Sequence, residues 1–136
     1  MARFLRVDSK KFFVNECEWG FWSMIVRNLE HEEVVRSLYR AHGGASAVML
    51  LTSQVLEGML FFAHAVLKPG KEIEAHVDPY EEIYYILEGE GYMMVGDEGR
   101  AVKTGDAIWL PYGVPHSLKN TGDKDCAILV SAAMPR

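Results

Sequence analysis

Apolar runs alternate with short turn sequences along most of the chain, from residue 46 to the C-terminus. The turns are rich in glycine, proline, asparagine and aspartate, and most of them recur about every ten residues. Strands are predicted over 47–52, 59–67, 81–88, 92–95, 100–103, 107–110, 116–118 and 126–132. Many short strands with regularly spaced turns are typical of an antiparallel sandwich or barrel, so the sequence predicts an all-β domain.

The first 45 residues have a different pattern. Residues 1–27 predict irregular structure with short extended pieces, one of them a strand at 24–26, and the apolar clusters at 12–14 and 19–22 are interpreted as packing residues that cover a sheet face or lie in a dimer interface. Asn28 and the acidic residues after it are typical of a helix start, and His42-Gly43-Gly44 of a helix end. The same segment also fits a strand followed by a turn. We therefore divide the chain into an N-terminal extension, 1–45, that packs on the barrel and includes a short helix, and a barrel, 46–136.

Composition narrows the class of protein. The chain has 136 residues, of which 49% are hydrophobic and 24% charged, as in one ordinary soluble globular domain. A net charge of -5 without a basic patch argues against a nucleic-acid partner. The run 59–67 is too short for a membrane span, and no signal peptide is recognised. Cys17 and Cys126 form no CxxC pair, so we expect free thiols and a cytoplasmic protein.

Candidate chemistry is concentrated between residues 76 and 82. His76, Asp78 and Glu82 fall within seven residues, and side chains two positions apart on a strand share a face. Imidazole and carboxylate groups on one face are suited to a divalent metal ion. A second stretch adds His116 after a turn that contains proline and glycine. Together the two stretches predict a metal site.

The two stretches resemble the signature motifs of the cupin superfamily. The first motif, G-x5-H-x-H-x3-E-x6-G, is matched by Gly70, His76, Glu82 and Gly89, with Asp78 in place of the second histidine. The second motif, G-x5-P-x-G-x2-H-x3-N, is matched by Gly105, Pro111, Gly113, His116 and Asn120. The resemblance covers about half of the chain, roughly residues 59–130. It implies a double-stranded β-helix, or jelly roll, with one metal ion in the barrel mouth, and a homodimer.

The resemblance implies that His76, Glu82 and His116 are metal ligands. Two imidazoles and one carboxylate form a set that binds Fe(II), Mn(II) or similar ions and leaves coordination positions open. Asp78 departs from the family pattern, and three alternatives stay open for it. It binds the metal, and the second carboxylate then favours Mn(II) or Fe(II) over copper; or it is too short to reach the ion and orients a water or a histidine; or the pocket binds no metal.

Several other side chains are weaker candidates. His64 would support the site if it pointed inward, and otherwise it is a core histidine. Tyr84 shares a face with Glu82 and is expected to line the cavity. Three further residues are considered for the cavity lining: Tyr92, Met94 and Trp109. Three side chains are expected to be exposed to solvent: Glu81, His31 and His42. Asn120 is interpreted as a turn former.

Fold does not determine function in this family. The leading hypothesis is a metal-dependent enzyme that acts on a small organic molecule as a dioxygenase (an oxidoreductase), an isomerase or a lyase. Fe(II) or Mn(II) is the favoured cofactor, and Ni or Zn are further candidates. The alternative is a non-catalytic module that binds or senses a small ligand. No catalytic residue beyond the metal ligands is assigned. The expected partners are a small-molecule substrate or ligand and a second copy of the chain, with no nucleic acid and no membrane.

Overall fold

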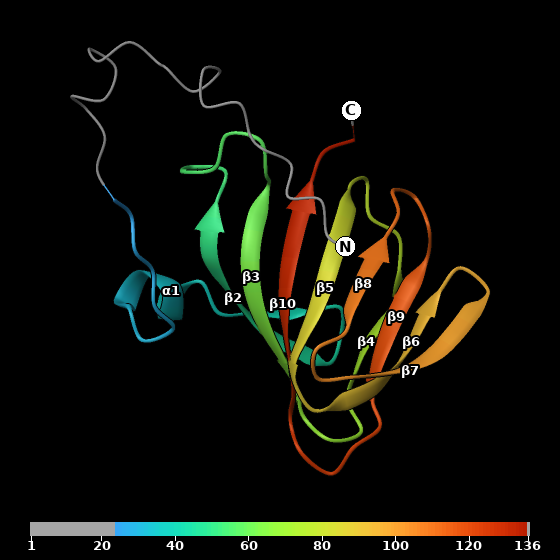
Figure 1. Ribbon diagram of the computed structural model, residues 1–136. Coiled ribbons are helices and arrows are strands. Elements are labelled where there is room, and N and C mark those ends of the chain that lie inside the picture. The colour runs from blue at the N-terminus through green and yellow to red at the C-terminus, as the bar shows by residue number, and fades with distance from the viewer. Residues whose placement is uncertain (1–23, 136) are drawn as a thin grey trace, which may run out of the picture.

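The computed structural model describes residues 24–135 of the 136-residue chain. This part contains one short helix and ten strands, coloured along the chain in Figure 1. The elements are α1 (Glu32–Arg36), β1 (Tyr39–Ala41), β2 (Ala45–Thr52), β3 (Phe61–Leu67), β4 (Glu72–His76), β5 (Glu81–Glu88), β6 (Glu90–Val95), β7 (Glu98–Lys103), β8 (Ala107–Leu110), β9 (His116–Asn120) and β10 (Cys126–Ala133). No helix in this part is long and apolar enough to cross a membrane.

The strands form two antiparallel sheets that face each other. Sheet A has six strands in the order β1-β2-β3-β10-β5-β8, and sheet B has four in the order β4-β9-β6-β7. In Figure 1 the strands of sheet A run from β2 on the left to β8 near the centre, and the strands of sheet B lie to the right. A bridge between Gly43 and Ile73 links the β1 side of sheet A to β4 of sheet B. The predicted jelly-roll fold is confirmed.

The core lies between the two sheets and follows from the alternation of side chains along each strand. In β5 the buried positions are Glu82, Tyr84 and Ile86, while their neighbours are exposed. Large aliphatic side chains such as Leu118 and Ile128 are fully buried in the interior. Four of the inward positions on β2 and β3 are occupied by a small residue: Ala45, Ala47, Ala63 and Ala65. Their small volume leaves room for a cavity beside the functional groups described below.

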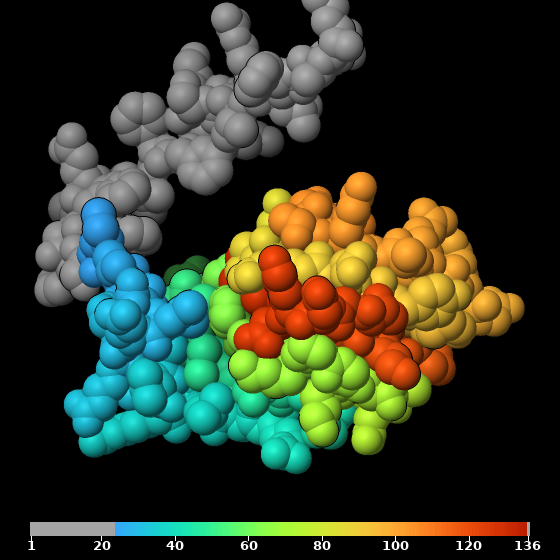
Figure 2. Space-filling model, turned by 90° about the horizontal axis from the view of Figure 1, so that it is seen from below, coloured from blue at the N-terminus to red at the C-terminus, as the bar shows by residue number. Residues whose placement is uncertain are grey.

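Two turns close one end of the barrel. The β3–β4 turn and the β9–β10 turn are joined by a Lys68–Asp125 ion pair of 2.9 Å, and Figure 2 views this end, with the two turns side by side in light green and red. Asn120 is buried, and its amide donates hydrogen bonds to the carbonyl oxygens of Leu67 and Lys124. Its oxygen accepts one from the Gly122 amide. The interpretation of Asn120 as a turn former is confirmed.

The N-terminal part differs from its prediction. Residues 24–26 form no strand, so that prediction is wrong. The helix is a single short turn whose N-cap is His31, not Asn28, because the Asn28 side chain accepts a hydrogen bond from the Glu30 amide in a preceding turn. After the helix the chain forms β1, so helix and strand both occur in this segment. The apolar clusters at 12–14 and 19–22 lie outside the described residues.

Candidate metal centre

Four polar side chains from four separate positions converge inside the barrel. His76 ends β4, Asp78 lies in the following loop, Glu82 is on β5 and His116 begins β9. Each offers one ligand atom, and these four atoms all lie within 4.8 Å of one another. Pairing of β4 with β9 sets His76 opposite His116, while strand alternation turns Glu82 inward from sheet A. The sequence-predicted cluster is therefore assembled by contacts between the two sheets.

The distances within the cluster are short. The Oδ2 atom of Asp78 lies 3.0 Å from Nε2 of His76 and 3.4 Å from Nε2 of His116. The latter atom is 3.7 Å from Oε1 of Glu82. Three of the four residues are almost fully buried, since Asp78 is 8%, Glu82 5% and His116 2% exposed. Asp78 thus lies within the cluster, and its contact with an ion stays a prediction.

Backbone carbonyl groups orient both imidazoles. Nδ1 of His76 lies 2.7 Å from the oxygen of Glu74, and Nδ1 of His116 lies 3.0 Å from the oxygen of Val114. A carbonyl can only accept a hydrogen bond, so each Nδ1 carries the proton and each Nε2 lone pair faces the cluster. Such outer hydrogen bonds fix the ring orientation of metal-binding histidines in general.

The atoms that face the centre of the cluster lack conventional partners. Within residues 24–135, neither Nε2 atom nor Oδ2 of Asp78 has a hydrogen-bond partner, although the three lie near one another. Buried polar atoms without partners are rare and costly. Both Nε2 atoms lie within 3.4 Å of Oδ2 of Asp78, but with the proton on Nδ1 all three atoms are acceptors and form no hydrogen bond to each other. Two imidazole nitrogens and two carboxylates form a donor set that fits one divalent cation.

The electrostatics of the metal-free cluster favour binding of a cation. Burial, followed by hydrogen bonding to Asp78 and its negative charge, raises the pKa of Glu82 to about 9. Burial also acts to raise the pKa of Asp78, but the hydrogen bond with Glu82 and the neighbouring imidazoles outweigh it and lower that pKa. Burial lowers the pKa of His116. Without metal the carboxylate pair therefore retains one proton on Glu82, which a divalent cation would displace.

A cavity of about 240 Å³ adjoins the cluster on the side of β2 and β3. Glu82 and His42 line it together with three tyrosines, and the inward alanines of β2 and β3 give it its space. Tyr84 is buried and lines the cavity, as predicted. Tyr39 and Tyr80 also line it and were missed. Tyr80 stands two residues before Glu82, and this spacing could have identified it, because side chains two positions apart on a strand share a face.

Several weaker candidates are placed elsewhere. His64 lies on the opposite face of β3 from the buried Ala63 and Ala65, so it points away from the barrel interior. The predicted lining by Tyr92 and Met94 is wrong, because the buried residue of this run is Met93. Glu81 is exposed and accepts a hydrogen bond from the Trp109 indole at 3.1 Å.

Of the two histidines expected at the surface, His31 is exposed as predicted. His42 is exposed as predicted, and in addition its ring stacks on that of His76, with ring centroids 3.4 Å apart and an interplanar angle of 8°. His42 is therefore part of the surroundings of the cluster.

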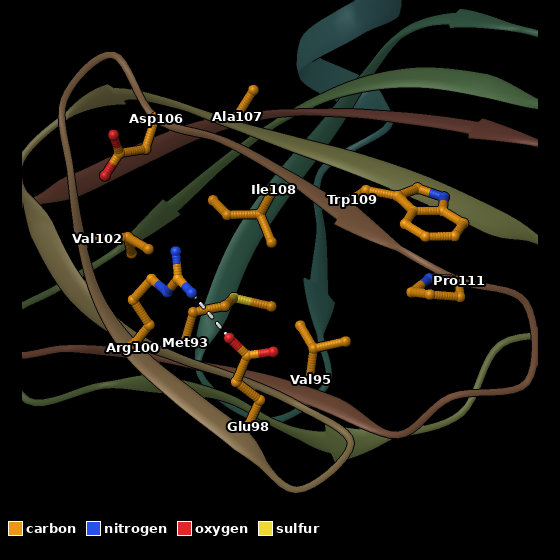
Figure 3. Close-up of a pocket in the computed structure, with 10 residues that line it drawn as sticks. All are labelled: Met93, Val95, Glu98, Arg100, Val102, Asp106, Ala107, Ile108, Trp109 and Pro111. Atoms are coloured by element: carbon orange, nitrogen blue, oxygen red, sulfur yellow. Dashed lines mark hydrogen bonds and ion pairs between the residues drawn. The ribbon is translucent and has the colours of Figure 1, made fainter.

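A second cavity of about 520 Å³ opens between β7 and β8, which are one edge strand of each sheet (Figure 3). Met93, Val95 and Ile108 point into it from the inner faces of the sheets, while Trp109 lies at one end, 63% exposed. Val95 is the Cα partner of His116, so this cavity approaches the cluster from the other side. Of the three proposed lining residues, Trp109 borders this cavity, whereas Tyr92 and Met94 line neither this cavity nor the one beside the cluster.

Comparison with known proteins decides the family. A model described as "Cupin domain" matches residues 63–132, which include all four clustered side chains. The chain belongs to the cupin family. This cupin is 32% identical over 109 residues to an oxalate-binding protein of Thermotoga maritima, which covers 78% of this chain and 90% of that protein. The crystal structure of a predicted oxalate decarboxylase from Thermotoga maritima superposes with a TM-score of 0.72 at 29% identity, covering 82% of this chain and 100% of that one.

Other relatives share a smaller part of their length with this cupin. An uncharacterised protein of Methanocaldococcus jannaschii is 39% identical over 74 residues, and the match spans 54% of this chain and 59% of that protein. A 3-hydroxyanthranilate 3,4-dioxygenase of Bacillus cereus is 39% identical over 62 residues, which are 42% of this chain and 35% of the dioxygenase. The sequence shared with these two is therefore only part of each protein.

Proposed function

We propose that this cupin is a metal-dependent enzyme that acts on a small organic molecule through one divalent ion held by His76, Asp78, Glu82 and His116. The observation that carries the proposal is the convergence of their four ligand atoms within 4.8 Å in a buried site. Three of these atoms have no hydrogen-bond partner within residues 24–135, which is the condition expected of ligands without their ion.

Fe(II) or Mn(II) is the ion that this donor set favours, with Ni or Zn as further candidates. Two carboxylates compensate the charge of a divalent ion and make the site harder than one built from histidines alone. The bound ion supplies Lewis-acid chemistry to the substrate. Asp78 and Glu82 provide the negative charge, while the carbonyls of Glu74 and Val114 hold the two imidazoles in the binding orientation.

The substrate that we propose is small and carries oxygen groups. The adjoining cavity of about 240 Å³ has apolar walls that include Met49 and Phe61. Burial raises the pKa values of Tyr80 and Tyr84, and the nearby carboxylates add to the effect. The phenols therefore stay protonated and can donate hydrogen bonds to substrate oxygens. Relatives named for oxalate binding and for 3-hydroxyanthranilate oxygenation support this class of molecule.

The second candidate function is binding or sensing of such a molecule without turnover. The relative that is named an oxalate-binding protein favours it, because the match spans 90% of that protein. In this case too the clustered side chains would hold the ion, and the ligand would occupy the cavity.

Metal analysis combined with water relaxation distinguishes the two functions. The full-length chain is purified without added metal, its metal content is measured, and the Mn(II)-loaded form is studied by water-proton relaxation. An enzyme is expected to hold one Fe or Mn per chain with an exchangeable water. A chain with an organic ligand in its cavity and no exchangeable water at the ion would support a binding module. A chain that takes up neither Fe(II) nor Mn(II) would refute the metal site.

A further inference from the structure

The corner between β1 and β2 is packed tightly against β4. It consists of His42, Gly43 and Gly44, and lies outside the region that the cupin model matches. The amide of Glu74 donates a hydrogen bond of 2.8 Å to the carbonyl of His42, and Gly43 bridges to Ile73. A Cβ added at Gly44 would meet backbone atoms of Glu72 at 2.2 Å. The corner is therefore fixed in place beside the strand that carries His76.

The backbone of His42 adopts a conformation that few side chains accept. Its φ is +43°, and within residues 24–135 it is the only residue other than glycine with a positive φ. This left-handed conformation is uncommon for residues with a Cβ. Here it turns the imidazole onto the ring of His76, where the two rings stack with an interplanar angle of 8°.

The stack and the hydrogen bond of His76 restrict different motions of its ring. The bond from Nδ1 to the Glu74 carbonyl holds one edge of the ring, while a parallel neighbour 3.4 Å away limits rotation of the ring plane. His76 has the least buried side chain of the two clustered histidines, 12% exposed against 2% for His116. The ring of His76 is therefore held less firmly by its surroundings than that of His116, and a neighbour that covers one of its faces has a larger effect.

His42 itself is outside the ligand cluster. The four atoms within 4.8 Å of one another belong to His76, Asp78, Glu82 and His116, and no nitrogen of His42 is among them. We infer that His42 is a positioning residue, whose imidazole holds the His76 ring in the plane that aims Nε2 at the metal site. This inference rests on the proposed metal site and adds a residue of the N-terminal extension to it.

Three variants of the full-length chain separate ring stacking from the other roles of His42. His42→Asn tolerates the left-handed backbone but has no ring, and His42→Phe keeps a flat ring without nitrogen. His116→Ala serves as the variant that lacks a ligand. Each is freed of metal, checked for folding by thermal unfolding and titrated with Co(II), whose visible spectrum reports the geometry around the ion. If His42→Asn does not fold, His42→Gly replaces it.

We expect His42→Asn to bind Co(II) about 10- to 100-fold more weakly than the wild type and with an altered visible spectrum, as is usual when an outer partner of a ligand is lost. His42→Phe should restore both properties. Wild-type affinity and spectrum in His42→Asn would overturn the inference. Equal losses in His42→Asn and in a His42→Phe variant that unfolds at the wild-type temperature would also overturn it, because a nitrogen of His42 would then be required.

A measurement without metal separates this inference from the proposed function. In the metal-free wild type, the ring protons of His76 should show a ring-current shift in the NMR spectrum that is lost in His42→Asn and regained in His42→Phe. Unchanged His76 resonances in all three proteins would disprove the stack. Absence of Co(II) binding by a wild type that has the shift would refute the metal site but not the stack.

Discussion

Asp78 is the residue that distinguishes this site from the motif it otherwise follows. Its carboxylate lies 3.0 Å from Nε2 of His76, inside the cluster, where the motif has an imidazole. Two carboxylates and two imidazoles compensate the charge of a divalent ion more fully than one carboxylate and three imidazoles. We therefore expect Asp78 to affect which ions the proposed metal site prefers.

Asp78→His tests this effect. The change should raise affinity for the softer ions Ni(II) and Cu(II) relative to Mn(II), because imidazole is a softer ligand than carboxylate. Competition titrations of the metal-free protein with pairs of ions measure the preference. An unchanged order of affinity would mean that Asp78 does not contact the ion.

Glu82 should make the stability of the metal-free protein depend on pH. Its pKa is raised to about 9 in the folded chain, so above its unfolded value the folded state retains a proton that the unfolded chain has released. Stability must then fall as pH rises through this interval. Between pH 7 and 8.5 the lowered pKa values of Asp78 and His116 leave their protonation the same in both states, so Glu82 dominates the slope.

Urea unfolding in the presence of a chelator measures this slope. The free energy of unfolding of the wild type should decrease from pH 7 to 8.5 by up to about 1.4 kcal/mol per pH unit. Glu82→Gln should remove most of the decrease and leave the smaller part due to Cys126, whose thiol pKa is also raised by burial, while the exposed neighbour variant Glu81→Gln should keep all of it. A slope that is the same in Glu82→Gln and the wild type would show that Glu82 is ionised in the folded state.

Individual residues could be predicted where a motif or a strict alternation specified them. His76, Glu82 and His116 stand at motif spacing, and Tyr84 follows Glu82 by two positions. The run Tyr92-Met93-Met94 is apolar throughout, so alternation could not tell which side is inside. Pairing of Met93 with Leu118 decides it. The proximity of His42 to His76 depends on contacts between the β1–β2 corner and β4, which lie far apart in the sequence and give no local signal.

At the scale of the elements, turn residues made most strands predictable. Glycines and prolines separate the apolar runs, and eight predicted strands correspond to β2, β3 and β5 to β10. The helix was harder, because Asn28 begins a turn that resembles a helix start, and the helical segment itself is only five residues long. The close approach of the β1–β2 corner to β4 is also a tertiary feature, and it yields a prediction.

Gly44→Ala should destabilise the fold through this approach. The added methyl group would lie 2.2 Å from the carbonyl oxygen of Glu72, so the corner or the strand must move. Overpacking of this kind typically costs about 1–3 kcal/mol. Gly58→Ala is a matched control, since nothing lies within 4 Å of its added group. Chemical denaturation should show the loss only in Gly44→Ala, and equal stability of the two variants would contradict the tight packing.

At the scale of the whole molecule, the outer face of sheet A carries apolar side chains that are exposed and do not pack in the core. Ile83, Tyr85 and Trp109 lie on it with exposures of 50%, 41% and 63%. Exposed apolar patches of this kind often mark protein contacts. They agree with the expectation of a homodimer, which stays a prediction.

Light scattering of the full-length chain should give twice the monomer mass of 15.3 kDa. Ile83→Glu should shift the mass toward the monomer, because a carboxylate at a buried contact is costly. Tyr92→Glu, on the exposed face of sheet B, is the control and should leave the dimer intact. A wild-type monomer at all concentrations would refute the prediction.

Calorimetric titration of the metal-free full-length protein with Mn(II) tests the central claim most directly. The wild type and His64→Ala, whose histidine faces away from the cluster, should each bind one ion per chain. His116→Ala should bind at least about 100-fold more weakly, because removing a metal ligand lowers the affinity more than removing a hydrogen-bond partner of a ligand, which costs up to about 100-fold. Wild-type affinity in His116→Ala, or no binding by the wild type, would contradict a metal site formed by His76, Asp78, Glu82 and His116.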